Sequence, residues 1–206
     1  MRFPNGHKGV KKLFASEILN IAATLLFFAT AVIGIINSKK SSDDRYLTAV
    51  FVLLLFAGIV AIVSFLQQII GINQARKDGR YFGTALIFLF AGIPADIVAS
   101  VTEGTFRNIF SSINEVLTLL VTVYIILGIY DLAEKLENKN LMLHGKVVLF
   151  LSASVFAAAV LFRTVPVFVP RTESLFNLIV AVMEFIGYLV FLIYLGRARK
   201  MLSGKE

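Results

Sequence analysis

Three carboxylic acids lie deep inside long apolar runs of this sequence, and their chemistry depends on that setting: Asp96, Glu115 and Glu184. An ionised carboxylate at the centre of a membrane-spanning helix costs about 2.5–3.5 kcal/mol, so such a residue persists only with a partner or a purpose. Glu184 is the ninth residue after Leu175 and falls near the middle of its run. We therefore expect its carboxyl group to be protonated or to face a polar interior.

Other polar residues recur at helical spacing around these acids. Residues three, four or seven positions apart share one face of a helix, and this spacing gathers polar side chains beside Glu184 and beside Glu115. These residue types can bind a proton or a cationic ligand. The predicted ligand- or proton-binding site consists of Glu184, Asp96, Glu115, Asn177, Tyr188 and Thr118.

Asp96 follows Gly92 and Pro94, which loosen a helix and free a carbonyl group from its internal hydrogen bond. If the run that contains Asp96 and the next run form a hairpin, Asp96 and Glu115 lie at similar depth and can face each other. Repulsion between two neighbouring carboxylates keeps a proton on one of them, which makes a site for a proton or a cation.

Three arginines near the same boundary offer another interpretation of these acids. Arg107, Arg163 and Arg171 could neutralise them as buried ion pairs that fix how the helices pack. Under this interpretation the carboxylates are structural and bind no ligand. Both interpretations remain open.

The apolar runs themselves indicate a membrane protein. Of the 206 residues 58% are hydrophobic and only 16% are charged, whereas a soluble domain is about one quarter charged. Leu47 to Leu66 contains no charged residue, and a run of about 18 or more apolar residues spans a lipid bilayer. The net charge of +7 is explained by cationic cytosolic loops, so we expect the lipid bilayer and no nucleic acid as partner.

The fold class predicted is an all-α integral membrane protein, a bundle of about six transmembrane helices in a single domain over residues 1–206. Lysine and arginine concentrate in the loops that share a side with the N-terminus, fourteen against six in the other loops, so the positive-inside rule places both termini in the cytosol. The predicted spans are 14–36, 46–70, 82–101, 110–130, 147–162 and 175–195.

Three weaker patterns concern the even-numbered spans and the fifth span. A glycine followed by alanine and cations recurs at Gly71, Gly128 and Gly196, as in three hairpin repeats or as at any helix end in the cytosol. Residues 131–146 alternate acids and bases, which predicts that the fourth span continues as an amphipathic helix closed near Gly145. Small residues in the fifth span permit close helix packing, within the protein or against a partner protein.

Motifs of enzymes and of metal or cofactor sites do not occur. The sequence has no cysteine, no H-E-x-x-H, no G-x-S-x-G and no phosphate-binding glycine loop. His7 and His144 lack a metal-ligand spacing. We therefore expect no enzyme, no cofactor, no metal and no catalytic residue.

The segment 71–82, Gly-Ile-Asn-Gln-Ala-Arg-Lys-Asp-Gly-Arg-Tyr-Phe, resembles small multi-pass membrane proteins of Gram-positive bacteria, most of them without a defined activity. The resemblance covers spans two to four and implies a bacterial plasma membrane. Size and topology are also similar to the substrate-capture subunits of energy-coupling-factor vitamin importers. Span one, however, lacks the ladder of small residues that such subunits present to their partner.

The leading functional hypothesis is transport or ligand binding through buried carboxylates, in one protein or in a subunit of a larger complex. The alternative is a non-catalytic accessory subunit that binds a membrane protein partner or a second copy of itself. The third is an intramembrane enzyme that modifies lipid. Water-reachable acids would favour the first hypothesis, and acids paired with arginine or with a partner would favour the second.

Overall fold

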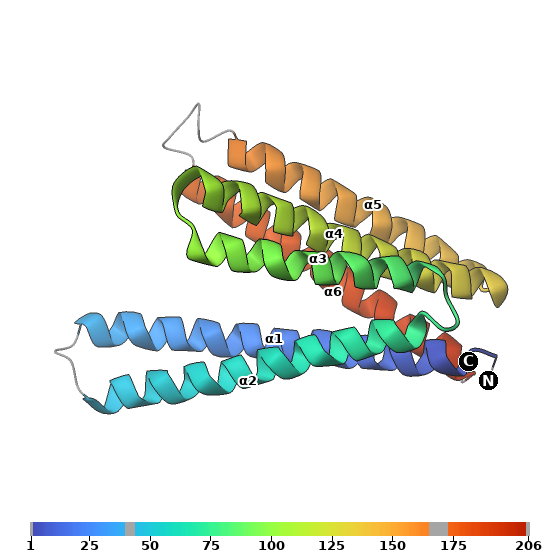
Figure 1. Ribbon diagram of the computed structural model, residues 1–206, viewed down its shortest axis with the longest axis horizontal. Helices are drawn as coiled ribbons and strands as arrows, with labels where there is room; N and C mark the ends of the chain where they lie inside the picture. The colour runs from blue at the N-terminus through green and yellow to red at the C-terminus, as the bar shows by residue number, and fades with distance from the viewer. Residues whose placement is uncertain (1, 40–43, 165–172, 205–206) are drawn as a thin grey trace. The chain divides into compact units, whose positions relative to one another are not determined.

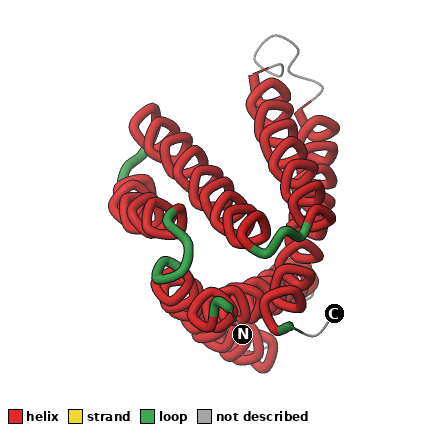
Figure 2. Tube along the Cα trace, turned by 90° about the vertical axis from the view of Figure 1, so that its right-hand side faces the viewer, coloured by secondary structure: helices red, strands yellow, loops and turns green. Residues whose placement is uncertain are grey.

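The computed structural model describes residues 2–39, 44–164 and 173–204, and within these ranges it is α-helical with no strand (Figures 1 and 2). Its helices, in chain order, are α1 (Pro4–Lys39), α2 (Asp44–Ala75), α3 (Tyr81–Val101), α4 (Gly104–Lys135), α5 (Lys139–Thr164) and α6 (Glu173–Ser203). The prediction of an all-α bundle of six helices is confirmed.

All six helices in the described ranges are long and apolar enough to cross a membrane. The shortest, α3, has 21 residues, and at about 1.5 Å per residue it measures about 32 Å, which spans a hydrocarbon core of about 30 Å. Large apolar side chains face outward, among them Phe28 at 68% exposure and Phe150 at 75%. Lipid accepts such a surface and water does not, so the chain is a multi-pass membrane protein.

The helices extend beyond the predicted spans. The first helix begins at Pro4, ten residues before the predicted start. The fifth, α5, covers Lys139–Thr164 and extends beyond the predicted span 147–162 at both ends. Hydropathy marks only the part of a helix that lies in lipid. Polar turns continue the same helix outside that part because each backbone group still bonds within the helix.

The chain forms two compact units, residues 11–71 and residues 1–10 together with 72–206. Within the first unit, the Ser64 hydroxyl of α2 donates a hydrogen bond to the Ser16 carbonyl of α1 at 2.7 Å. The Ser16 hydroxyl donates to the Leu13 carbonyl at 2.8 Å. Both serines are buried, so each polar side chain is satisfied by a backbone oxygen at the point where the two helices meet.

The second unit packs its helices in chain order: α3 against α4, α4 against α5, and α5 against α6 (Figure 1). Phe82 of α3 is fully buried and its ring lies against Gly128 of α4, where a Cβ atom would stand 2.7 Å from the ring. Fourteen residues along each helix, Asp96 of α3 meets Asn114 of α4. The two contacts fix the antiparallel register of this hairpin.

A second glycine joins α5 to α6. A Cβ atom at Gly145 would stand 2.8 Å from the Tyr194 hydroxyl oxygen, and Tyr194 is 1% exposed. The same hydroxyl donates to the carbonyl of Ile126 on α4 at 3.4 Å. Gly145 therefore lets one tyrosine connect three helices.

The N-terminal residues belong to this second unit and lie against the α2–α3 turn. The Asp78 carboxylate of that turn accepts hydrogen bonds from the Gly6 backbone N–H at 2.7 Å and from the Asn5 amide at 3.2 Å. It thereby satisfies donors at the exposed end of α1, where the helix dipole also favours negative charge. Arg2 and Lys135 bring the end of α4 to the same place.

The prediction of one continuous helix across residues 131–146 is wrong. Helix α4 ends at Lys135 and α5 begins at Lys139, with Glu137 in the left-handed region at φ 56°. The Asn138 side chain accepts a hydrogen bond from the Leu141 N–H at 2.9 Å and so caps the new helix. Gly145 lies inside α5 and contacts Tyr194 instead of closing a helix.

Candidate functional site

The predicted site residues all belong to the second unit but come from three helices. Asp96 lies on α3, Glu115 and Thr118 on α4, and Glu184 and Tyr188 on α6. Asp96, Thr118 and Glu184 are exposed, whereas Glu115 and Tyr188 are half-buried. Asn177 lies in α6 as well, and its side chain falls outside the described ones. The principal contacts follow chain order, so Asp96 and Glu184 belong to different hairpins.

Asp96 is the acid whose surroundings are best defined. The Asn114 side-chain amide of α4 donates to an Asp96 carboxylate oxygen at 3.3 Å. Asn114 is placed there by Gly92, because a Cβ atom at Gly92 would stand 3.1 Å from the Asn114 side-chain oxygen. The glycine thus serves close approach of the neighbouring helix, and Asn114 orients a carboxylate whose remaining surface is exposed.

Pro94 stands inside α3, two residues before Asp96, and the helix continues through it. A proline has no N–H, so the carbonyl group four residues earlier, at Phe90, loses its intrahelical donor. The carboxylate of Asp96, oriented by Asn114, is an acceptor suited to a cationic or hydrogen-bond-donating group. This is the chemistry that the sequence predicts for Asp96.

Glu115 lies one residue from Asn114, and therefore at nearly the depth of Asp96. Consecutive helical residues point about 100° apart, so Asn114 and Glu115 leave α4 in different directions, and Glu115 takes part in an interaction of its own. The described contact of Asp96 is the amide of Asn114. The prediction missed this amide because depth along a helix is set by spacing, whereas direction is set by packing.

Glu184 lies eleven residues into α6, on the stretch where this helix packs against α5. Three residues further, a Cβ atom at Gly187 would stand 3.5 Å from Val155 of α5. Glu184 and Tyr188 both take part in further side-chain interactions. Arg171, and the side chain of Arg163, lie outside the described residues, so their pairing with the acids stays a prediction.

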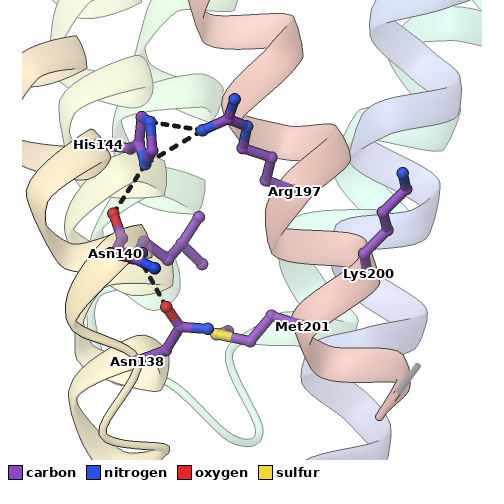
Figure 3. Close-up of a pocket in the computed structure, with 7 residues that line it drawn as sticks. Asn138, Asn140, His144, Arg197, Lys200 and Met201 are labelled. Carbon is purple, nitrogen blue, oxygen red and sulfur yellow. Dashed lines mark hydrogen bonds between the residues drawn. The ribbon is translucent and has the colours of Figure 1, made fainter. Parts of the chain in front are cut away.

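A second polar site lies between the first turns of α5 and the last turns of α6, and none of its residues was predicted. It is a cavity of about 360 Å³, lined by the apolar Leu141 and Met201 and by the polar Asn138, Asn140, His144, Arg197 and Lys200. In Figure 3 Arg197 points across from α6 to His144, whereas Lys200 points away from it. The lining described here carries no carboxylate.

The hydrogen bonds of His144 define its tautomer. Its Nδ1 lies 2.7 Å from the Asn140 carbonyl oxygen, which can only accept, so Nδ1 carries the hydrogen. Nε2 then accepts from Arg197 Nη1, since a guanidinium group only donates. The imidazole thus holds the guanidinium group of α6 against α5.

Comparison with protein-family models, curated proteins and solved structures finds no match to this chain. Within the described residues, no group of three or more His, Asp or Glu side chains is placed to hold a metal ion.

The signals for the second site were present in the sequence but separated. His144 and Arg197 are 53 residues apart, and each was interpreted alone, as an isolated histidine and as a cation at the end of a span. The antiparallel packing of α5 on α6 brings them together. A hairpin register taken from Gly145 and Tyr194 would have placed them at the same level.

Proposed function

We propose that this protein is a non-enzymatic membrane protein that binds a cationic or hydrogen-bond-donating small molecule at Asp96 and takes part in its transport. The observation that carries the proposal is the pairing of Asp96 with Asn114 beside Pro94, on helices that cross the bilayer. An oriented carboxylate with exposed surface can accept hydrogen bonds from a ligand that reaches it. The resemblance of residues 71–82 supports a bacterial plasma membrane.

The proposal is tested by stability in the presence of cations. A bound ligand stabilises the folded state by about 2.7 kcal/mol at one hundred times its Kd. We expect at least one of sodium, magnesium and spermidine, at constant ionic strength, to raise the apparent Tm of the purified protein. Asp96→Asn should lose this increase, because the amide is neutral and has a single acceptor oxygen.

Glu103→Gln provides the matched control, since Glu103 is an exposed acid just after α3 and its substitution removes the same charge. It should keep the cation effect. Equal increases in Tm for the parent and Asp96→Asn, or none in the parent for any of the three cations, would contradict the proposal.

The proposed topology places both termini in the cytosol. Both described ends of the chain lie at one end of the second unit, because residues 2–6 contact Asp78 and Lys135 and the last turns of α6 contact His144. The native sequence has no cysteine, so single cysteines at Ser203 and Glu103 report each side. A membrane-impermeant maleimide added to whole cells should label Glu103→Cys and spare Ser203→Cys; the reverse pattern would invert the topology.

An accessory role is the second candidate, and the exposure of Asp96 on an apolar helix favours it. Ile97 and Val101 beside it are 57% and 75% exposed. A carboxylate in lipid is costly, so a cationic side chain of a membrane partner could cover it. Under this hypothesis Asp96→Asn releases a co-purifying membrane protein while no small cation changes the Tm of the parent.

A further inference from the structure

The cavity between α5 and α6 has the donors of an anion site at the level where these helices leave the apolar region. Arg197 and Lys200 follow the last apolar stretch of α6, and Asn138 precedes the first one of α5. The lining supplies a guanidinium group, side-chain amides and no carboxylate among its described residues. The nearby Asp131 is already paired with Lys135 at 2.8 Å.

Arg197 is oriented for a second partner. Its described contacts with His144 use the Nη1 nitrogen alone, which donates to Nε2. The guanidinium group has five N–H donors in a rigid plane, so Nη2 and Nε keep donors in the fork geometry that matches phosphate oxygens. His144 fixes this plane through its own bond to the Asn140 carbonyl, which lowers the entropy cost of binding.

An exposed apolar stripe on α5 starts beside this cavity. Leu143, Val147 and Phe150 are 64%, 54% and 75% exposed, and their spacing places them on one face of the helix. Val147 lies one helical turn beyond His144, at i+3, so this face adjoins the face of α5 that lines the cavity. A ligand with a phosphate in the cavity can therefore lay an acyl chain along α5.

We propose that this cavity binds the phosphate of an anionic lipid headgroup, with Arg197 as its principal donor and the Leu143–Phe150 face as the acyl track. The volume of about 360 Å³ suits a small headgroup. Basic pockets between transmembrane helices on the cytosolic side recognise such headgroups. Lys200 contributes charge through a flexible side chain that points away from His144.

The test measures lipid retention by native mass spectrometry on delipidated full-length protein, with phosphatidylglycerol or phosphatidylcholine added at equal concentration. Phosphatidylglycerol should bind the parent preferentially. Arg197→Gln should weaken this binding about tenfold, the loss expected for one charge-assisted contact. Arg76→Gln removes the same charge from an exposed turn outside the cavity and should change binding less than twofold.

Further experiments distinguish a lipid phosphate from a soluble phosphate, and a loss of binding from a loss of folding. Val147→Ser should weaken lipid binding and leave stabilisation by inorganic phosphate unchanged. If inorganic phosphate raises the parent's Tm and Val147→Ser leaves lipid binding unchanged, the phosphate site belongs to a soluble ligand and the lipid proposal is wrong. If Arg197→Gln fails to fold by circular dichroism, Arg197→Lys, which keeps the charge without the fork, should show an intermediate loss.

Equal weakening by Arg197→Gln and Arg76→Gln would overturn the proposal, because it would reveal general attraction between a cationic surface and anionic lipid. Equal binding of phosphatidylglycerol and phosphatidylcholine would overturn it as well. Neither result would bear on Asp96, which lies on another hairpin.

Discussion

In both the α3–α4 and the α5–α6 hairpin an aromatic ring of one helix packs against a glycine of the other. The helix that carries the ring is the first one in α3–α4 and the second one in α5–α6. In the first, Phe82 of the odd-numbered helix lies against Gly128 of the even-numbered one; in the second, Tyr194 of the even-numbered helix lies against Gly145 of the odd-numbered one. The phenylalanine contact is apolar, and the same ring also lies against Gly79 of the α2–α3 turn. The tyrosine hydroxyl also reaches Ile126 of α4, so the second contact connects its hairpin to the rest of the unit.

The two hairpins also place their polar sites at opposite ends. The acidic pair Asp96–Asn114 lies toward the α3–α4 turn, whereas the basic pair His144–Arg197 lies where α5 begins and α6 ends. An aromatic ring on a glycine sets the register in both cases, and the register decides which polar side chains meet. Packing between helices thus selects the functional residues from a larger set that the sequence offers.

The largest expected effect comes from filling the two glycine contacts. In Gly128→Ala the new methyl group would stand 2.7–2.8 Å from three atoms of the Phe82 ring, a rigid neighbour. Such overpacking costs about 1–3 kcal/mol, so the apparent Tm by circular dichroism should fall. Gly145→Ala should lower the Tm less, because its closest neighbour is a single hydroxyl oxygen at the tip of Tyr194.

Gly83→Ala is the control for both, since a methyl group there meets no atom within 4 Å and alanine favours the helix. Adding Tyr194→Phe to Gly145→Ala should recover stability by removing the crowded oxygen. If Gly128→Ala melts at or above the temperature of Gly83→Ala, the Phe82 ring does not require a glycine at position 128, and the contact does not set the register of this hairpin.

The sequence predicts much of this fold because apolar length is a strong physical signal. The run from Leu47 to Leu66 lies within α2, and each predicted span overlaps one helix. The break after Lys135 was missed because no glycine or proline marks it: Glu137 adopts the left-handed conformation itself, and the Asn138 cap becomes evident only with the turn. Spacing along one chain carries no signal for such a non-glycine turn.

The sequence did not identify the described partner of Asp96. Asp96 was placed at the level of Glu115, and the described contact is with the adjacent Asn114, which differs by one residue and about 100°. The pairing of His144 with Arg197 required the register of two helices whose contact residues are 53 positions apart. Rotation and register come from tertiary packing, which one sequence without its structure does not specify.

The next largest effect concerns Asp78, which binds the start of α1 to the turn that precedes the α3–α4 hairpin. Asp78→Ala removes the acceptor of two hydrogen bonds from the start of α1, and a lost cap costs about 0.5–2 kcal/mol. We expect faster hydrogen exchange at the amides of residues 5–8 and little change in α5. Asp78→Asn keeps one acceptor oxygen and should be intermediate. Unchanged exchange in Asp78→Ala would show that the N-terminal segment is held by other contacts.

The smallest expected effect separates helix capping from anion binding in the α5–α6 hairpin. Asn138→Ala removes the oxygen that accepts from the Leu141 N–H and should destabilise the protein by about 1 kcal/mol. Asn138→Asp keeps the cap, since aspartate and asparagine cap equally well, but it adds a negative charge to the cavity.

Asn138→Asp should therefore retain the parent's Tm while it weakens phosphatidylglycerol binding, and Asn138→Ala should lower the Tm with a smaller effect on binding. If the variant with the higher Tm is the one that retains less lipid, the role of Asn138 in capping α5 is distinct from its role in the cavity. Parallel losses in both variants would instead mean that lipid binding depends on the stability of the first turn of α5. In that case Asn138 acts as a helix cap alone, and the cavity is not shown to be a basic site that contrasts with the acidic site at Asp96.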